Sequence, residues 1–144
     1  MQGLNVVVLD EVARECPLPI NQGASAATQY WILATQLRKE IKLTSKYDYV
    51  IADRSIMDTI AYGITLDVLD PDMAWAYKPY VLDLYKRIYL LDPIAFDYQV
   101  EDGIRDLDKE FRLKVDNTLY YLYKLLNISV IRISSQEELD AIEI

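Results

Sequence analysis

Four short apolar runs, separated by stretches with helical spacing, constrain the fold of this chain more than any other feature. They are Leu4–Leu9, Val50–Ala52, Arg87–Leu91 and Ile128–Ile133. The first two are nearly continuous runs of β-branched and aliphatic residues, which is typical of strands buried on both faces of a parallel sheet. With the helical stretches between the runs, the predicted order is β, α, β, α, α, β, α, β, α. This alternation predicts an α/β fold with a doubly wound parallel sheet.

The first long helix is predicted after the polar loop of residues 21–25, where apolar side chains recur at intervals of three and four. These side chains are Tyr30, Leu33, Ala34, Leu37 and Ile41. Gln29 and Gln36 lie near this stripe. We interpret both glutamines as interface or surface polar residues, although either can also contact a ligand.

Three further helices carry start signals or a clear periodicity. Asp70 and Pro71 predict a helix with the aspartate as its N-cap and the proline in its first position. Pro79 is expected to kink or restart that helix. The apolar pattern over residues 107–126 predicts the most regular helix of the chain. Residues 134–137, SSQE, form a capping box that opens a short last helix.

Length and charge bound the class of protein. A chain of 144 residues is long enough for one domain with a sizeable core, so we expect a single domain over residues 1–144. The formal net charge of −8 argues against a nucleic-acid-binding surface. No run approaches the roughly 18 apolar residues that a membrane span needs, and no signal peptide opens the chain. We therefore expect a cytoplasmic protein without nucleic-acid or membrane partners.

Histidine is absent from the chain, and Cys16 is its only cysteine. Metal sites built on histidine, and Ser-His or Cys-His nucleophile pairs, are therefore excluded. A single cysteine cannot form an intrachain disulfide, which favours a reducing compartment.

Acidic and basic residues follow the first two apolar runs directly. Asp10, Glu11 and Arg14 come after the first run, and Asp53 and Arg54 come after the second. The carboxyl ends of parallel strands meet at the edge where open α/β sheets bind ligands, so these residues predict a shared crevice for phosphate and metal. There, Asp53 can hold a metal or a proton. Arg54 can bind phosphate oxygens with its fork of donors.

Structural roles for the same residues stay open. Asp53 and Arg54 can pair with each other or cap the helix that follows them. Arg14 can form a surface ion pair with Asp10 or Glu15, of a kind that contributes little to stability.

Several segments, taken together, resemble the P-loop kinase-like ATPases with an AAA domain. They are LDEVARECP, the long helix with Gln36 and Glu40, YVIADRSIMDTIAY and DGIRDLDKEFR. The chain is similar to the group related to NadR-type ribosylnicotinamide kinases, while thymidylate kinases and deoxynucleoside kinases are more distant. The likeness covers nearly the whole chain in order and spacing.

This resemblance implies a three-layer α/β nucleotide kinase fold that uses ATP and Mg²⁺. The implied reaction is phosphoryl transfer to a nucleoside, a nucleotide or a similar small molecule. Asp53 matches the acidic residue that serves the metal or the acceptor hydroxyl, and Arg54 matches the arginine near the phosphates. Glu11 and Arg14 match residues on the acceptor side.

Arg105, in the segment DGIRD, matches an arginine of the family's lid, and residues 95–112 are the candidate lid region. An arginine that closes over the phosphates would meet the charge that spreads over the phosphoryl oxygens in the transition state. The alternative is that Arg105 pairs with Asp102 or Asp106.

The family's defining motif, G-x-x-x-x-G-K-[ST], does not occur in these 144 residues. In the family it lies on a first strand, loop and helix of about 25–30 residues, nearly one βα unit, which would precede Leu4. We therefore expect that an amino-terminal unit has been removed, or that the start is assigned too late. The family's first strand is central, so its loss leaves two strand pairs with exposed inner edges. These edges must pair with each other, with a second chain in a homo-oligomer, or with nothing.

Two functional hypotheses follow. In the first, the protein is a small-molecule kinase or ATPase, impaired in this chain because the ATP phosphates lose their main anchor. In the second, it is a non-catalytic, truncated relative that acts as a nucleotide- or protein-binding module. A flavodoxin-like binding protein would share the fold class, but no loop here has the Ser, Thr and Gly density of a phosphate-binding nest.

Overall fold

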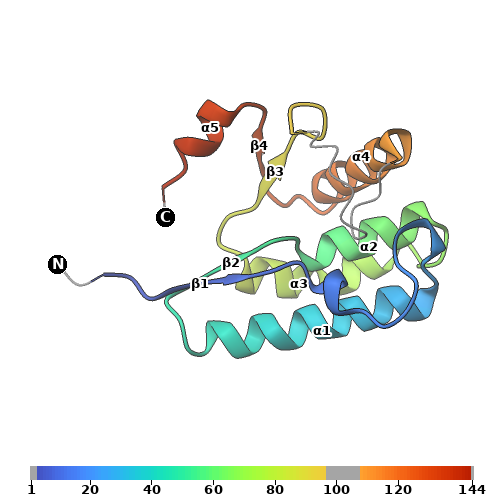
Figure 1. The fold of residues 1–144 in the computed structure, drawn as a ribbon, viewed down its shortest axis with the longest axis horizontal. Coiled ribbons are helices and arrows are strands. Elements are labelled where there is room, and N and C mark those ends of the chain that lie inside the picture. The colour runs from blue at the N-terminus through green and yellow to red at the C-terminus, as the bar shows by residue number, and fades with distance from the viewer. Residues whose placement is uncertain (1–2, 97–107, 144) are drawn as a thin grey trace. The chain divides into compact units, whose positions relative to one another are not determined.

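The computed structural model describes residues 3–96 and 108–143. The chain divides into two compact units, Met1–Pro71 and Asp72–Ile144. Each unit contains one two-stranded parallel sheet together with its own helices (Figure 1). The predicted order of strands and helices along the chain is confirmed, with two short 3₁₀ turns in addition.

The first unit pairs two strands and packs a long helix against them. Its elements are β1 (Val6–Leu9), the 3₁₀ turns η1 (Val12–Glu15) and η2 (Asn21–Gly23), α1 (Ala26–Thr44), β2 (Tyr49–Ala52) and α2 (Ile56–Thr65). β1 and β2 are parallel, with Val6 opposite Tyr49 and Leu9 opposite Ala52. α1 contacts both strands and α2, and Figure 1 shows it running alongside the strand pair.

The buried face of α1 differs from the predicted apolar stripe. Leu33 is buried, but Tyr30 and Ile41 of that stripe are exposed. The other buried residues of the helix are polar: Thr28, Gln29, Gln36 and Glu40. Of the two alternatives for these glutamines, interface or surface, the surface one was therefore wrong. α1 turns a polar face inward, and the two glutamine amides donate to the backbone carbonyls of Thr59 and Arg54.

The prediction that β1 and β2 are buried on both faces was also wrong. Val8 is 60% exposed and Ile51 is 44% exposed, whereas Leu9 is buried. Val8 and Ile51 are register partners, and paired residues of neighbouring strands lie on the same face of a sheet. One face of the strand pair therefore packs into the unit, and the other presents apolar side chains to solvent.

The second unit contains the remaining strand pair. Its elements are α3 (Met73–Leu84), β3 (Tyr89–Leu91), α4 (Lys109–Leu125), β4 (Ile131–Ile133) and α5 (Gln136–Asp140). β3 and β4 are parallel, and Leu90 lies opposite Arg132. The predicted apolar pattern of α4 is confirmed at Leu119 and Leu122, which are buried.

Helix starts in this unit differ from the predictions by one or two residues. α3 begins at Met73 with Asp72 as its N-cap, two residues later than expected, and it continues through Pro79 without ending. The last helix has Ser135 as its N-cap, whose hydroxyl accepts from the backbone N–H of Glu138. The hydroxyl cap therefore lies one residue further along the chain than predicted, and the Glu138 carboxylate accepts from the N–H of Ser134, so the reciprocal bond of a capping box is not formed with Ser135.

A bidentate ion pair joins α4 to β4. The Nη1 and Nη2 atoms of Arg132 donate to Asp116 at 3.0 and 2.6 Å. The hydrogen bond to Asp116 is the main cause that raises the pKa of Arg132 above its usual value, and partial burial only partly opposes it. This pair fixes the helix against a strand of only three residues.

The two strand pairs form separate sheets within the described ranges, β1-β2 and β3-β4. This observation agrees with the expectation of two strand pairs. Among residues 3–96 and 108–143, no helix combines the length and the apolar character that a membrane crossing requires.

Candidate functional site

The carboxyl ends of β1 and β2 meet in the first unit, as their parallel register requires. The backbone N–H of Asp53 donates to the carbonyl oxygen of Leu9 at 2.8 Å, which extends the pairing just beyond β2. Oε1 of Glu11 then lies 3.6 Å from Nε of Arg54. The structure therefore brings together three of the predicted site residues, Glu11, Asp53 and Arg54, at one edge of the strand pair.

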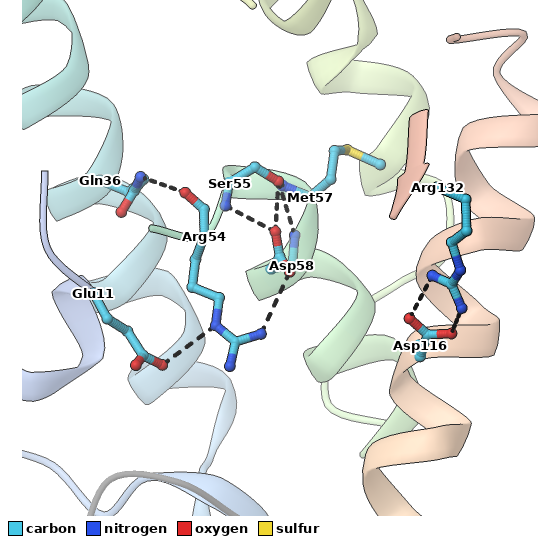
Figure 2. A network of polar contacts seen from close by, with 8 residues as sticks. All are labelled: Glu11, Gln36, Arg54, Ser55, Met57, Asp58, Asp116 and Arg132. Atoms are coloured by element: carbon cyan, nitrogen blue, oxygen red, sulfur yellow. Dashed lines mark hydrogen bonds and ion pairs between the residues drawn. The ribbon is translucent and has the colours of Figure 1, made fainter. Parts of the chain in front are cut away.

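Arg54 has an uncommon backbone conformation, and its side chain forms ion pairs with two carboxylates. Its φ is 80°, in the left-handed region that side chains rarely occupy. Besides Glu11, its Nη1 faces Oδ1 of Asp58 at 3.8 Å (Figure 2), and the side chain is still 54% exposed. Partial removal from water opposes the charge, but Asp58, Glu11 and Asp53 outweigh this and raise the pKa of Arg54. The guanidinium is thus held between two carboxylates and remains open to a ligand.

Ser55 and Asp58 fix the chain directly after Arg54. The Ser55 hydroxyl accepts from the backbone N–H groups of Met57 and Asp58, at 3.1 and 3.3 Å. In return, Oδ2 of Asp58 accepts from the Ser55 N–H at 2.8 Å. The alternative that Asp53 or Arg54 caps α2 is therefore wrong. One carboxylate oxygen of Asp58 caps the helix, and the other faces the guanidinium.

Two buried side chains of α1 hold the backbone before this cap. Nε2 of Gln36 donates to the carbonyl oxygen of Arg54 at 3.2 Å and to Oε2 of Glu40 at 2.6 Å. Both Gln36 and Glu40 are 2% exposed. On the same helix face, Nε2 of Gln29 donates to the carbonyl oxygen of Thr59 at 2.8 Å.

Sequence reasoning missed this supporting role. The available signal was spacing, because Gln29, Leu33, Gln36 and Glu40 recur at intervals of four, three and four. That interval places them on one face of a helix, so the polar members share the face of a buried leucine.

A pocket of about 300 Å³ lies beside Glu11. Its lining residues are Leu9, Asp10, Glu11, Arg14, Glu15 and Lys39. Lys39 of α1 forms an ion pair with Glu15, and Arg14 is exposed. Three carboxylates and two cations line this pocket, which suits a polar ligand with hydroxyl groups better than an apolar one.

The predicted lid with Arg105 and the predicted metal contact of Asp53 are not tested by these contacts. Arg105 and the lid residues 97–107 lie outside the described residues. In the ranges 3–96 and 108–143, no group of three or more His, Cys, Asp or Glu side chains is arranged to hold a metal ion. Asp53 follows β2 as an exposed carboxylate, and its contact with a metal stays a prediction.

Comparison with protein families matches residues 4–138 to the AAA domain family. The chain belongs to this family. The match confirms the resemblance to P-loop proteins with an AAA domain, a nucleotide-binding class. Searches among curated proteins and among solved structures found no match to this AAA domain. Since one fold serves many reactions, the chemistry of an AAA domain must be argued from its site, here the ends of β1 and β2.

Proposed function

We propose that this AAA domain belongs to an ATP-dependent small-molecule kinase and binds the phosphoryl acceptor beside Glu11 and Arg54. The observation that carries the proposal is the half-exposed guanidinium of Arg54, held between Glu11 and Asp58 at the carboxyl ends of two parallel strands. Phosphoryl transfer depends mainly on positioning and on positive charge near the transferred group. A guanidinium that is oriented before the ligand arrives meets both needs.

The pocket beside Glu11, the ion-pair partner of Arg54, supports a hydroxyl-bearing acceptor. Glu11 and Arg14 both line it, so one site offers hydrogen-bond acceptors for hydroxyl groups and a cation for phosphate. A volume of about 300 Å³ is at the lower end of the range for small-molecule sites. The acceptor class is therefore a nucleoside, a nucleotide or a similar small molecule.

Asp53 is proposed to accept the proton of the acceptor hydroxyl or to contact Mg²⁺. It is an exposed carboxylate next to Arg54, and carboxylate oxygen is the ligand that Mg²⁺ prefers. ATP would supply the phosphoryl group, with Mg²⁺ neutralising its charge. The 144 residues contain no G-x-x-x-x-G-K-[ST] motif, so they account for the acceptor side of the reaction and not for the phosphate-binding loop.

The three-layer sheet of nucleotide kinases, a single domain over residues 1–144 and a lid with Arg105 belong to the same proposal. What supports them is the family membership together with the two parallel strand pairs. A cytoplasmic location and a reducing environment are proposed with them.

The test is ATP-dependent phosphorylation of a panel of nucleosides and nucleotides, with the protein isolated from its natural source. We expect transfer of the γ-phosphate to at least one acceptor. Asp53→Asn should lower kcat by about 100-fold or more, because it removes a proton acceptor or a metal ligand. Arg54→Gln should lower kcat/KM for the acceptor by a similar factor.

Matched controls are Asp83→Asn on α3 and Arg38→Gln on α1, which remove exposed charges that take no part in the ion pairs of Arg54 and should leave both constants unchanged. Transfer that survives both site substitutions would contradict the proposed roles of Asp53 and Arg54. Nucleotide binding without transfer to any acceptor would favour the alternative, a non-catalytic nucleotide- or protein-binding module.

A further inference from the structure

β1 carries a backbone edge that faces away from β2. The carbonyl oxygen of Leu9 accepts from the N–H of Asp53 in β2's continuation. In a parallel ladder, alternate residues of a strand bond to the same neighbour. The backbone N–H and C=O groups of Val7 and Leu9 therefore point toward β2. Val6 and Val8 then direct their N–H and C=O groups to the other side. Within the described residues, the sheet of this unit consists of β1 and β2 alone, so no strand covers that side.

The side chains along this edge are apolar and exposed. Leu4, Val6 and Val8 are all exposed, and their spacing of two places them on one face of the strand. Ile51, the register partner of Val8, continues this face onto β2 and is exposed as well. These four residues are called the β1 patch below.

The edge has none of the usual protection against pairing. Residues 4–9 contain no charged residue and no proline, and the register of β1 with β2 runs without a bulge. Natural edge strands generally carry at least one of these devices, because an open edge is a template for another strand. Asn5 is the polar residue of this segment, and its backbone N–H donates a hydrogen bond to Oδ2 of Asp48 at 2.9 Å.

We propose that two copies of this chain associate through β1, with the two strands antiparallel about a two-fold axis at Val7. Rotation about that axis places Val6 of one copy opposite Val8 of the other, so both free edges exchange hydrogen bonds. The joined sheet has the order β2-β1-β1-β2, and the two β1 patches become continuous across it. This inference is independent of the proposed kinase activity.

Charge selects the antiparallel arrangement. Asp10 and Glu11 follow β1 at its carboxyl end, so a parallel pair would place like carboxylates side by side. In the antiparallel pair, Asp10 lies opposite Leu4, and the acidic ends of the two strands point apart. Two chains of net charge −8 therefore meet along an uncharged segment.

The contact is short, since β1 has four residues. Interfaces of small area are weak and reversible, so we expect a dissociation constant in roughly the micromolar range. Association should therefore depend on protein concentration.

The first experiment is sedimentation equilibrium of the full chain over concentrations around that range. Val8→Lys places a charge at the centre of the patch and should raise the dissociation constant by at least about tenfold. Leu82→Lys is the matched control, because Leu82 on α3 is exposed to nearly the same degree (58%) and should leave the dimer unchanged.

The second experiment identifies the axis and does not depend on the folding of the lysine variant. The substitution Val7→Cys is made in a Cys16→Ser background. In the proposed dimer, residue 7 of one copy lies opposite residue 7 of the other as a non-hydrogen-bonded pair, with Cα atoms about 4.5 Å apart. That separation suits a disulfide, so oxidation should give a covalent dimer. Val6→Cys is the control, since residue 6 lies opposite residue 8 of the second copy. The two residues 6 are therefore further apart than the roughly 7 Å between Cα atoms that a disulfide can span.

Three outcomes would overturn the proposal. They are a monomer at every concentration, a dimer that Val8→Lys does not weaken, and cross-linking of Val6→Cys at least as fast as that of Val7→Cys. The last outcome would indicate random collision, because Val6 is more exposed than Val7.

Discussion

The side-chain amide of Gln36 donates a hydrogen bond to the carbonyl oxygen of Arg54 at 3.2 Å, across 18 residues of sequence. This bond joins a buried helix face to a residue at the strand ends whose φ is positive. A left-handed conformation at a residue such as arginine costs about 1–3 kcal/mol and persists only where the surroundings hold it. Here Gln36 holds the carbonyl side of Arg54, and the Ser55–Asp58 capping box holds the chain that follows.

Replacing Gln36 by leucine should lower the free energy of unfolding by about 1–3 kcal/mol, because the change removes a buried donor from the Arg54 carbonyl and from Glu40. The chain offers a close control. Gln136 makes the same type of bond to Asp140, also four residues on, but on an exposed helix. Gln136→Leu should change stability by less than about 0.5 kcal/mol in the same urea titration. Equal effects of the two substitutions would contradict a special role for the buried amide.

Arg54→Gly should separate stability from function. Glycine removes the strain at φ 80°, while the loss of two partly exposed ion pairs costs about 0.2–1 kcal/mol each. These two contributions nearly cancel, so the free energy of unfolding should stay within about 1 kcal/mol of the wild-type value. Phosphoryl transfer should still fall steeply, as for Arg54→Gln.

The control for that substitution is Asp67→Gly, since Asp67 has a φ of 60° and lies at the exposed end of α2. It should stabilise the chain by up to about 1 kcal/mol and leave activity unchanged. A large loss of stability in Arg54→Gly would mean that its side chain is structural.

Ser55→Ala should cost about 1 kcal/mol, because Ser55 Oγ satisfies two backbone N–H groups at the start of α2. It should also remove the hydrogen bond that the Ser55 hydroxyl donates to Oδ2 of Asp58, while the backbone N–H of residue 55 still donates to the same oxygen. Thermal unfolding followed by circular dichroism measures the loss. Ser45→Ala, which removes a hydroxyl bonded to an exposed carbonyl at the end of α1, should stay within about 0.5 kcal/mol of the wild type. A smaller effect at Ser55 than at Ser45 would refute the capping role.

Gly63→Ala should destabilise the first unit by about 1–3 kcal/mol. A Cβ at this position would come within 2.4 Å of Cδ1 of Leu69, and Leu69 is buried and has little room to move. This overpacking outweighs the roughly 1 kcal/mol that alanine gains over glycine in a helix. Gly23→Ala is the comparison, because its Cβ would meet only Pro19 at an ordinary 3.8 Å. A stabilised Gly63→Ala variant would show that Leu69 rearranges freely.

Arg132→Gln should lower the free energy of unfolding by about 1–3 kcal/mol, since it breaks the bidentate contact with Asp116. A double-mutant cycle with Asp116→Asn should recover most of this loss as coupling energy. Arg38→Gln, on the exposed side of α1, is the control and should be nearly neutral.

The pH dependence of that loss follows from the raised pKa of Arg132. A base whose pKa is raised on folding contributes its full stabilisation below the unfolded-state value, and loses it only as the pH rises through the folded-state value. For arginine both values lie well above pH 10, so the effect of Arg132→Gln should be the same at pH 7 and at pH 10. A loss that shrinks between these two pH values would contradict an arginine that stays charged.

The order of elements and the meeting of Glu11, Asp53 and Arg54 could be predicted from sequence, because both depend on local signals. Short apolar runs and helical spacing locate strands and helices, and parallel pairing then brings the residues after each strand to one edge. Helix starts were less certain, as at Ser135, because neighbouring residues can serve equally well as N-caps.

The burial of Gln36 and Glu40 and the exposure of Val8 could not be read from the chain alone. Periodicity assigns a face to each residue, but only the neighbouring elements decide whether that face is covered. α1 turns a polar face inward because backbone carbonyls of the α2 segment lie there to accept its hydrogen bonds. β1 has an apolar composition on both faces, and the tertiary structure covers only one of them. The sequence thus determined which residues meet at the strand ends, and the packing of α1 decided how Arg54 is held there.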